Sequence, residues 1–419
     1  MQTFAFIPSF VPVSTRRPRV LATKFGDGYE QRGADGLHAD LQSWQLQFEH
    51  VPTREADQIE GFFLGNQTAI RPFLWSAPRP LSDYEARTWA AQGTNDNNWT
   101  SVAWNGALFV AVSSTGTGNR VMTSPDGKSW TLRTSAADSG WTSVVWAAEL
   151  GLFVAVAASA VANDVMTSPD GIAWTIRTGA STNAWQQVVW AAALGLLVAV
   201  ASTGIGNRVM TSPDGIAWTS RTSAADYSWT SVTYSPELSL LVAVADAAGG
   251  GTTDRCMTSP DGLVWTLRTI GTALNWRAVA WNSTRFAAVS SGTTGVSTSL
   301  DGLTWIQGTM PNSNTSRCIA WNGVVFAVGQ INAGVGNRVA TSRDGLSWTA
   351  GQGIPDNNWG GICAAGATFV AVSATGSANR AMVTVPTPTS FLCRSWTRQV
   401  VSPVTDRLAA TFEEVADPA

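Results

Sequence analysis

The amino-acid sequence predicts an all-β protein: a seven-bladed β-propeller inserted into a small β-rich domain that has one short helix. Two observations lead to this fold class. The motif Thr-Ser-Pro-Asp-Gly-x-x-Trp recurs, with drift, at intervals of 40 to 47 residues through the middle of the chain. Each interval also holds four short segments rich in β-branched or aromatic residues. Four strands in a repeat of this length are typical of a propeller blade.

The strand count of the repeats predicts how the ring closes. In the repeat after the first motif, we expect strands at residues 130–134, 142–146, 152–156 and 165–168. The Phe-Val-Ala-Val strand and its variants occur seven times, but the last repeat stops after residue 384 without an Asp-Gly turn. We therefore expect the seventh blade to take its fourth strand from residues 86–92, which leaves no open sheet edge.

The recurring Asp-Gly pair predicts a tight turn in six of the blades. Glycine accepts the positive φ that such a hairpin needs, and Asp can accept hydrogen bonds from its own backbone. The motif resembles the Asp-box of sialidase-like propellers, although it is one residue shorter. That resemblance implies a structural turn between the third and fourth strands, on the face away from a ligand. The turn residues are Asp126, Asp170, Asp214, Asp261, Asp301 and Asp344.

Residues 1–81 and 390–419 lack the repeat and are expected to form one discontinuous host domain. The propeller, at residues 86–385, is inserted between two proline-rich joints. Because the ends of a closed propeller must be adjacent, the insertion need not disrupt the host domain. At 419 residues the chain is long enough for two domains.

Within the host domain, three segments have clear patterns. Residues 42–48 alternate polar and apolar side chains, which predicts a half-buried strand. Residues 52–64 suit a short helix with Thr53 as N-cap and with Ile59, Phe62 and Phe63 on one side. Residues 391–400 and 408–415 are expected to be the closing strands.

One host-domain motif resembles a known family. Residues 24–32 read Lys-Phe-Gly-Asp-Gly-Tyr-Glu-Gln-Arg, and Pro-Phe-Leu-Trp follows at 72–75 and Ala-Thr-Phe-Glu-Glu-Val at 410–415. In this order they resemble the minor tail protein M family of lambda-type long-tailed phages. His38 departs from the family pattern, which tends to have Asn, and so does the inserted propeller. The motif residues that carry the resemblance are Phe25, Gly26, Asp27, Gly28, Tyr29, Gln31 and Arg32.

The resemblance implies a structural protein of the virion, located at the tail tip after synthesis in the host cytoplasm. It further implies a hexameric ring of this chain between the tail tube and the hub. The expected partners are other copies of the chain, the tail tube protein and the tail-tip hub proteins.

Composition and charge exclude several other classes of protein. The formal net charge of -3 gives no basic surface for nucleic acid. The longest apolar run, residues 188–201, is too short to span a membrane, and the first residues lack the basic region of a secretory signal. The four cysteines lie far apart without CxxC pairs, so we expect buried free thiols and neither a metal site nor a cofactor.

An enzyme is not expected, so we assign no catalytic residues. Glycoside hydrolysis needs two carboxylates at a defined separation, and the sialidase type needs a Tyr-Glu pair with an arginine cluster. Between residues 86 and 385, Glu149 and Glu237 are the glutamates, and both fall in equivalent turns between first and second strands. The arginines there occupy repeat positions, and the two histidines, His38 and His50, lie in the host domain.

The sequence favours glycan binding over catalysis as the molecular activity of the propeller. The face opposite the Asp-Gly turns carries two sets of loops with amide, arginine and tryptophan side chains, which suit hydrogen bonding and stacking on sugars. Two alternatives stay open: turn chemistry and inter-blade packing explain the same residues, and the propeller could be purely architectural, packing on other tail-tip proteins. The candidate glycan-binding residues are Asn119, Arg120, Asn207, Arg208, Asn337, Arg338, Asn379, Arg380, Trp99, Trp229 and Trp359.

Overall fold

The computed structural model separates the chain into two compact units. One unit is Met1–Leu81 with Pro386–Ala419, and the other is Ser82–Val385. The residues that the structure describes are 3–4, 13–16, 20–24, 30–34, 42–65, 73–75, 89–159, 163–246, 253–331, 338–351, 356–366, 368–384, 389–402 and 405–414.

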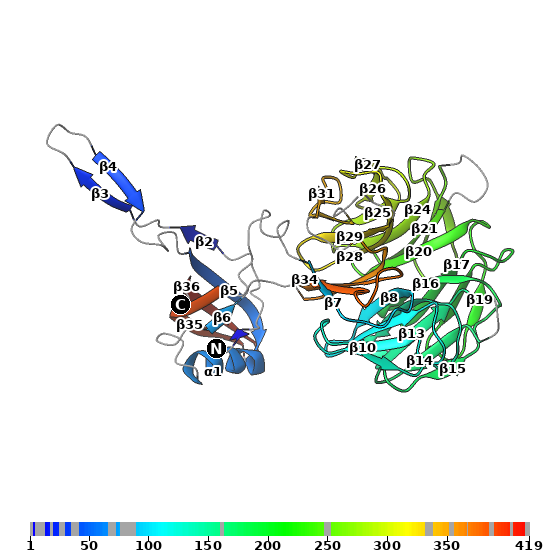
Figure 1. Cartoon of the computed structure of the whole chain (residues 1–419), viewed down its shortest axis with the longest axis horizontal. Coiled ribbons are helices and arrows are strands. Elements are labelled where there is room, and N and C mark those ends of the chain that lie inside the picture. The colour runs from blue at the N-terminus through cyan, green and yellow to red at the C-terminus, as the bar shows by residue number, and fades with distance from the viewer. Residues whose placement is uncertain are drawn as a thin grey trace. The chain divides into compact units, whose positions relative to one another are not determined.

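The unit Ser82–Val385 is a β-propeller (Figure 1), which confirms the predicted fold class. Its described residues form seven antiparallel sheets of four strands, here called blades 1 to 7. Neighbouring inner strands contact one another around the whole ring, including the last with the first. The inner strands of blades 1 to 7 are β8 (Trp99–Trp104), β12 (Trp141–Ala147), β16 (Trp185–Ala191), β20 (Ser228–Ser235), β24 (Trp276–Trp281), β28 (Thr315–Trp321) and β32 (Trp359–Ala365).

The second and third strands of each blade continue outward from the channel. The second strands are β9 (Phe109–Ser113), β13 (Leu152–Ala157), β17 (Leu196–Ala201), β21 (Leu240–Asp246), β25 (Phe286–Ser290), β29 (Phe326–Ile331) and β33 (Thr368–Ser373). The third strands are β10 (Val121–Ser124), β14 (Val165–Ser168), β18 (Val209–Ser212), β22 (Cys256–Ser259), β26 (Gly295–Ser299), β30 (Val339–Ser342) and β34 (Ala381–Thr384). In blades 2 and 3 a short 3-10 turn, η1 (Ala148–Leu150) or η2 (Ala192–Leu194), joins the first two strands.

The outer strands show how the ring closes. Blades 1 to 6 end in β11 (Thr131–Arg133), β15 (Thr175–Arg177), β19 (Thr219–Arg221), β23 (Thr266–Arg268), β27 (Ile306–Thr309) and β31 (Thr349–Ala350). Blade 7 instead takes its outer strand, β7 (Trp89–Gln92), from the start of the propeller. Trp89 pairs with Thr384 and Gln92 with Ala381, and Figure 1 shows β7 beside β34. The prediction that residues 86–92 supply the fourth strand of blade 7 is therefore confirmed for the four residues that form β7.

The blades are held together by apolar packing between neighbouring sheets. The second strands are buried along their length, as in β9 and β13, because a neighbouring blade covers each of their faces. The cluster between blades 1 and 2 shows the pattern: Val110 from β9 packs with Trp141 and Phe153 of the next blade. Trp141 and its equivalents in blades 1, 3, 4, 5 and 7 are fully buried at the start of their inner strands.

The Asp-Gly turns have the local structure that the sequence predicts. In blade 3 the Asp214 carboxylate accepts hydrogen bonds from the backbone N–H groups of Ala217 at 2.9 Å and Ile216 at 2.8 Å. These two bonds hold the pKa of Asp214 below its usual value. Gly215 has a φ of 73°, the left-handed region that favours glycine. Hydrogen bonds from the two backbone N–H groups that follow are repeated at Asp126, Asp170, Asp261, Asp301 and Asp344.

The other unit is built on a six-stranded sheet in the order β1-β6-β35-β36-β5-β2. Its strands are β1 (Thr3–Phe4), β6 (Phe73–Trp75), β35 (Thr389–Ser402), β36 (Thr405–Glu414), β5 (Gln42–Pro52) and β2 (Val13–Arg16). A separate two-stranded sheet pairs β3 (Val20–Lys24) with β4 (Glu30–Ala34).

A single helix among the described residues, α1 (Thr53–Gly65), packs on this sheet. Ile59 and Phe63 are buried, and the Phe63 ring lies 5.9 Å from that of Trp396 on β35. Arg398 of the same strand forms ion pairs with Asp57 at 2.8 Å and Glu60 at 2.6 Å. The predicted helix and both closing strands are therefore present. In the described chain, no helix is long and apolar enough to cross a membrane.

Each unit keeps its two cut ends side by side. In the host sheet, Trp75 of β6 pairs with Thr389 of β35. In the propeller, Trp89 of β7 pairs with Thr384 of β34. The host sheet and the sheet of blade 7 are therefore both continuous, although the chain leaves each of them and returns.

Candidate functional site

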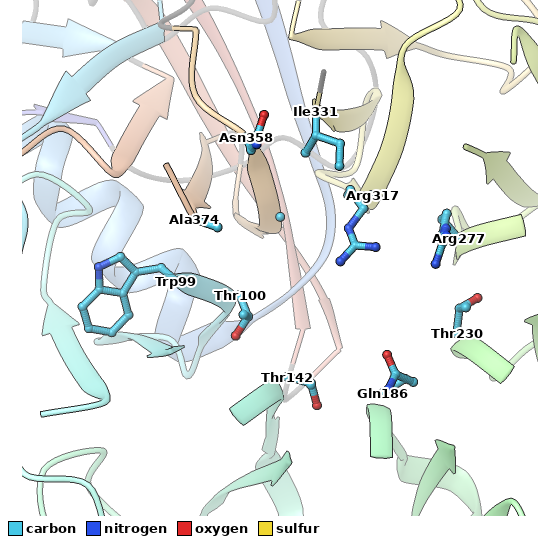
Figure 2. Close-up of a pocket in the computed structure, with 11 residues that line it drawn as sticks. Trp99, Thr100, Thr142, Gln186, Thr230, Arg277, Arg317, Ile331, Asn358 and Ala374 are labelled. Atoms are coloured by element: carbon cyan, nitrogen blue, oxygen red, sulfur yellow. The ribbon is translucent and has the colours of Figure 1, made fainter. Parts of the chain in front are cut away.

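The candidate site lies at one mouth of the propeller's central channel. Because the strands of each blade are antiparallel, the Asp-Gly turns and the starts of the inner strands fall on opposite faces. Cavities are found at the starts of the inner strands, one of about 240 Å³ and one of about 120 Å³ that share lining residues. We call the larger one the channel mouth (Figure 2).

One residue at an equivalent position in each blade contributes to the wall of the channel mouth. A β-bulge occurs at this position in every inner strand; in β8 the register shifts between Trp99 and Ser101, so Thr100 is the extra residue. A bulge re-aims the side chain of its extra residue. The seven ring residues, in blade order, are Thr100, Thr142, Gln186, Thr230, Arg277, Arg317 and Gly360.

Threonine has a structural role in this ring. The Thr100 hydroxyl donates to the carbonyl oxygen of Trp141 in the next blade at 2.8 Å. Thr142 donates in the same way to Trp185 at 2.7 Å, and Thr230 to Trp276 at 2.9 Å. The hydroxyl proton is used in this bond, whereas the oxygen keeps lone pairs that can accept a hydrogen bond from the channel.

Blades 5 and 6 replace this bridging threonine with arginine. Figure 2 shows the guanidinium groups of Arg277 and Arg317 projecting into the same cavity. Arg277 forms an ion pair with Asp246 at 2.7 Å, but its buried Nε has no hydrogen-bond partner. The Arg317 guanidinium makes no hydrogen bond or ion pair with the described residues. In blades 5 and 6, therefore, a cationic side chain takes the place of the threonine that bridges neighbouring blades elsewhere in the ring.

The two arginines give the channel mouth a net positive charge. Partial desolvation within the channel and the charge of Arg277 both lower the pKa of Arg317, although its side chain remains exposed to the open channel. An arginine nevertheless stays protonated near neutral pH because its unperturbed pKa exceeds 12. Asp246 offsets one of the two positive charges, and a bound anion would offset the other.

Several residues that line the smaller cavity hold neighbouring blades together. Ser101, Ser143 and Ser231 follow the ring residues and accept hydrogen bonds from backbone N–H groups of the next blade, as in Val144 N–H to Ser101 Oγ at 3.1 Å. Burial raises the pKa of the Cys318 thiol to about 12, so this thiol stays protonated and is a poor nucleophile. Cys256 and Cys318 are buried free thiols, as predicted, whereas Cys363 is a free thiol that is only half-buried, and the side chain of Cys393 lies outside the described residues.

The predicted arginine and asparagine loops form an internal bonding network on this face. In blade 1, Arg120 donates to the carbonyl oxygens of Gly116, Ser114 and Ser139, and its Nε lies 3.5 Å from Asp138. Arg208 and Arg380 repeat most of these contacts, and Arg338 donates to Asn358. The four arginine side chains are only 13 to 15% exposed.

The asparagines of these loops are also engaged within the propeller. The side-chain amide of Asn97 donates to Asn119, and Asn183 and Asn357 do the same to Asn207 and Asn379. Asn337 lies outside the described residues. Structural bonds therefore account for much of the polar chemistry of these loops, and glycan binding by them stays a prediction.

The prediction that three loop tryptophans are exposed for sugar stacking is wrong. Trp99, Trp229 and Trp359 have 0% relative exposure, because each lies at the start of an inner strand and is covered by neighbouring blades. Trp99 and Trp229 donate their indole N–H groups to the carbonyl oxygens of Asn95 and Ala225, four residues earlier. The alternative explanation, inter-blade packing, describes these positions correctly.

The remaining sequence candidates have structural roles or are not described. Glu149 accepts a hydrogen bond from Trp190 of the next blade, and Glu237 accepts one from Trp281 at 2.7 Å. In the phage-like motif, residues 25–29 lie outside the described residues. Gln31 and Arg32 belong to β4, where they pair with Thr23 and Ala22. Among the described residues, no cluster of three or more His, Cys, Asp or Glu could hold a metal ion.

Arg277 and Arg317 were not among the sequence candidates, although a signal was present. Both occupy the position directly after a buried residue near the start of the inner strand, where blades 1, 2 and 4 have Thr100, Thr142 and Thr230. Arginine is the only charged residue type among the seven ring residues, and a charge at a position that holds threonine in three blades marks a departure from the structural pattern. Comparing repeats at this position would have identified the pair.

Comparison with known proteins finds different similarities for the N-terminal part of the chain and for the propeller. Residues 2–105 match the model of the phage minor tail protein family. The resemblance predicted from the host-domain motifs is thereby confirmed. The chain is also 39% identical over 61 residues to tail tip protein M of Escherichia phage lambda, which is 15% of this chain and 54% of that protein. The chain thus spans about half the length of the curated relative it matches.

The propeller is similar in fold to several solved structures. A virginiamycin B lyase from Staphylococcus aureus is 12% identical, with a TM-score of 0.59 over 71% of this chain and 98% of that chain. The hydrazine synthase of Kuenenia stuttgartiensis is 13% identical, with a TM-score of 0.55 over 70% of this chain and 97% of that chain. At these identities the similarity concerns the fold alone.

Proposed function

We propose that this protein is a structural component of a phage tail tip, and that its propeller contributes to adsorption on host surface glycans. The match of residues 2–105 to phage minor tail proteins carries the first part of this proposal. By the same resemblance, the host domain forms a hexameric ring and contacts the tail tube and the hub.

The adsorption role follows from the way the propeller is attached. The host sheet keeps β6 and β35 paired across the insertion, so this sheet does not need the propeller for its own continuity. The channel mouth is a cavity with cationic and hydrogen-bonding side chains, which is the chemistry that a polar ligand requires.

The same site argues against an enzyme. Among the described residues that line the channel mouth there is no carboxylate, histidine or cysteine, and therefore no general acid, base or nucleophile of these types. One similar lyase structure is a form inactivated by replacement of a histidine. Here both histidines, His38 and His50, lie outside the propeller.

Deletion of residues 82–385 from the phage-encoded protein tests the proposal. This boundary keeps Thr389, the β35 partner of Trp75, in the host sheet. We expect the deleted phage to assemble tails and to adsorb poorly to its host cells. Normal adsorption would refute the adsorption role, whereas failure of tail assembly would favour an architectural propeller. Electron microscopy of wild-type and deleted tails would show whether the protein is at the tip.

A further inference from the structure

We propose that the channel mouth binds one acidic sugar unit, whose carboxylate or phosphate is held by Arg277 and Arg317. This inference deepens the proposed function and rests on it only for the source of the sugar, a polysaccharide of the host surface. The site itself is argued from the cavity and the donors and acceptors of its walls.

The arginine wall of the channel mouth has donors without partners. Arg317 is exposed to the channel, and its guanidinium makes no hydrogen bond with the described part of the chain, whereas the buried Nε of Arg277 is unsatisfied. Guanidinium groups bind carboxylate and phosphate through charge-assisted hydrogen bonds. An anion placed between the two arginines would relieve their mutual repulsion and satisfy these donors.

The opposite wall offers mainly acceptors. The hydroxyl groups of Thr100, Thr142 and Thr230 donate their protons to the next blade and keep free lone pairs. The Gln186 amide nitrogen donates to Ala184 and Ser202, which leaves Oε1 as an acceptor. Such a wall fits a ligand that presents several hydroxyl donors.

Together the two walls select a ligand with an anionic group on one side and hydroxyl groups on the other. An acidic monosaccharide unit has both. The volume of about 240 Å³ is below the roughly 300–1,000 Å³ typical of pockets for drug-sized ligands, and so suits a single sugar unit. Binding of a ligand in the channel would also explain why arginine is found at Arg277 and Arg317 in place of a threonine that bridges two blades.

Calorimetric titration of the full-length protein tests the site with four probes: glucuronate, glucose 1-phosphate, glucose and acetate. We expect at least one of the two acidic sugars to bind, and the other two probes to bind at least ten-fold more weakly. Preference for glucuronate or for glucose 1-phosphate identifies the anionic group. Equal binding of glucose would refute the role of the arginines, and equal binding of acetate would refute the role of the hydroxyl groups.

Two variants with the same change of charge make the test specific. Arg317→Thr restores the residue that the repeat has in blades 1, 2 and 4, and it should weaken acidic-sugar binding about ten- to a hundred-fold. The matched control is Arg343→Thr, in an exposed Asp-Gly turn on the opposite face, which should leave binding unchanged. Equal loss in both variants, or no loss in Arg317→Thr, would overturn the assignment.

Adsorption of phage that carries Arg317→Thr separates this inference from the proposed function. Weak sugar binding together with weak adsorption would support both. If the purified chain binds no acidic sugar while deletion of residues 82–385 still abolishes adsorption, the site is wrong and the proposed function stands. If Arg317→Thr loses sugar binding but neither change affects adsorption, the site stands and the adsorption role is wrong.

Discussion

The Asp-Gly turns and the channel mouth lie on opposite faces of the propeller and differ in how much their residues vary between blades. In six blades the turn has the same Ser-to-Asp hydrogen bond, at 2.9 to 3.0 Å, and the same left-handed glycine. At the channel mouth, the seven equivalent positions hold threonine, glutamine, arginine or glycine. Each turn makes an equivalent packing contact, so the same residues recur in six blades. The channel mouth is a single site to which each blade contributes one residue, so its ring residues can differ from blade to blade.

The packing of the turn glycines explains why the turns do not vary. A Cβ on Gly127 would lie 2.6 Å from Cγ2 of Val370 in blade 7, and one on Gly171 would lie 2.6 Å from Cγ2 of Val110 in blade 1. Each of these turns therefore fits closely against the preceding blade. A change there disturbs the contact between two blades, which is not so for a side chain that faces an open cavity.

The largest expected effect is that of Gly127→Ala. The methyl group adds strain at a φ of 71° and a clash with Val370, so we expect a loss of about 2–4 kcal/mol in the free energy of unfolding. Chemical denaturation of the full chain measures it. Gly118→Ala is the matched control, because Gly118 has a φ of 68° with nothing within 4 Å of its Cβ position. Equal losses in the two variants would contradict the role of blade contact.

The second prediction concerns Asp164, a buried departure from the repeat at the position of Arg120 and Arg208. Burial raises its pKa to about 6, although Trp185 and Gly179 donate hydrogen bonds to its carboxyl group at 2.8 and 2.9 Å. Because the folded state holds this proton more tightly than the unfolded state, stability should fall as the pH rises from about 4 to about 6.

Melting curves of the full chain between pH 4.5 and 7 measure this dependence. The wild-type protein should melt at a higher temperature at pH 5 than at pH 7, by an amount that corresponds to roughly 1 kcal/mol. Asp164→Asn should remove the slope in this range, whatever its absolute stability. The same slope in both proteins would assign the effect to another group.

A smaller effect is expected for Asp214→Ala. The variant loses the acceptor for Ile216 and Ala217 in an exposed turn, where water can replace it, so we expect a loss of about 1 kcal/mol. Denaturant midpoints measure it. The double variant Asp170→Ala, Asp214→Ala should lose the sum of the two single effects, because the turns are on different blades. Strong non-additivity would show that the turns are coupled around the ring.

The smallest effect on stability is expected for Arg317→Thr. Replacing this arginine removes the repulsion with Arg277 and restores a hydroxyl that can bridge to Trp359, so stability should stay within about 0.5 kcal/mol or rise slightly. Thermal unfolding measures it. A large loss of stability would mean that Arg317 supports the ring, and would remove the contrast between turns and channel mouth.

The sequence predicted the fold well because the fold is periodic. The repeated motif located the Asp-Gly turns, and the missing turn after residue 384 located the composite blade that β7 and β34 complete. It failed for Trp99, Trp229 and Trp359, because a loop-end tryptophan has the same local pattern whether it faces solvent or the next blade. It also missed Arg317, because the β-bulge that aims this side chain into the channel depends on strand register, which local composition does not reveal.

The composite seventh blade has a mechanical consequence. The two linkers to the host domain leave the propeller from Trp89 and Thr384, which are paired at the same end of β7 and β34. Tension between the units therefore draws both strands in one direction and does not peel one from the other. A pull along these strands loads the pairing of β34 with β33, whose hydrogen bonds lie across the strands and bear the load together. A propeller attached in this way can transmit force while its ring stays closed.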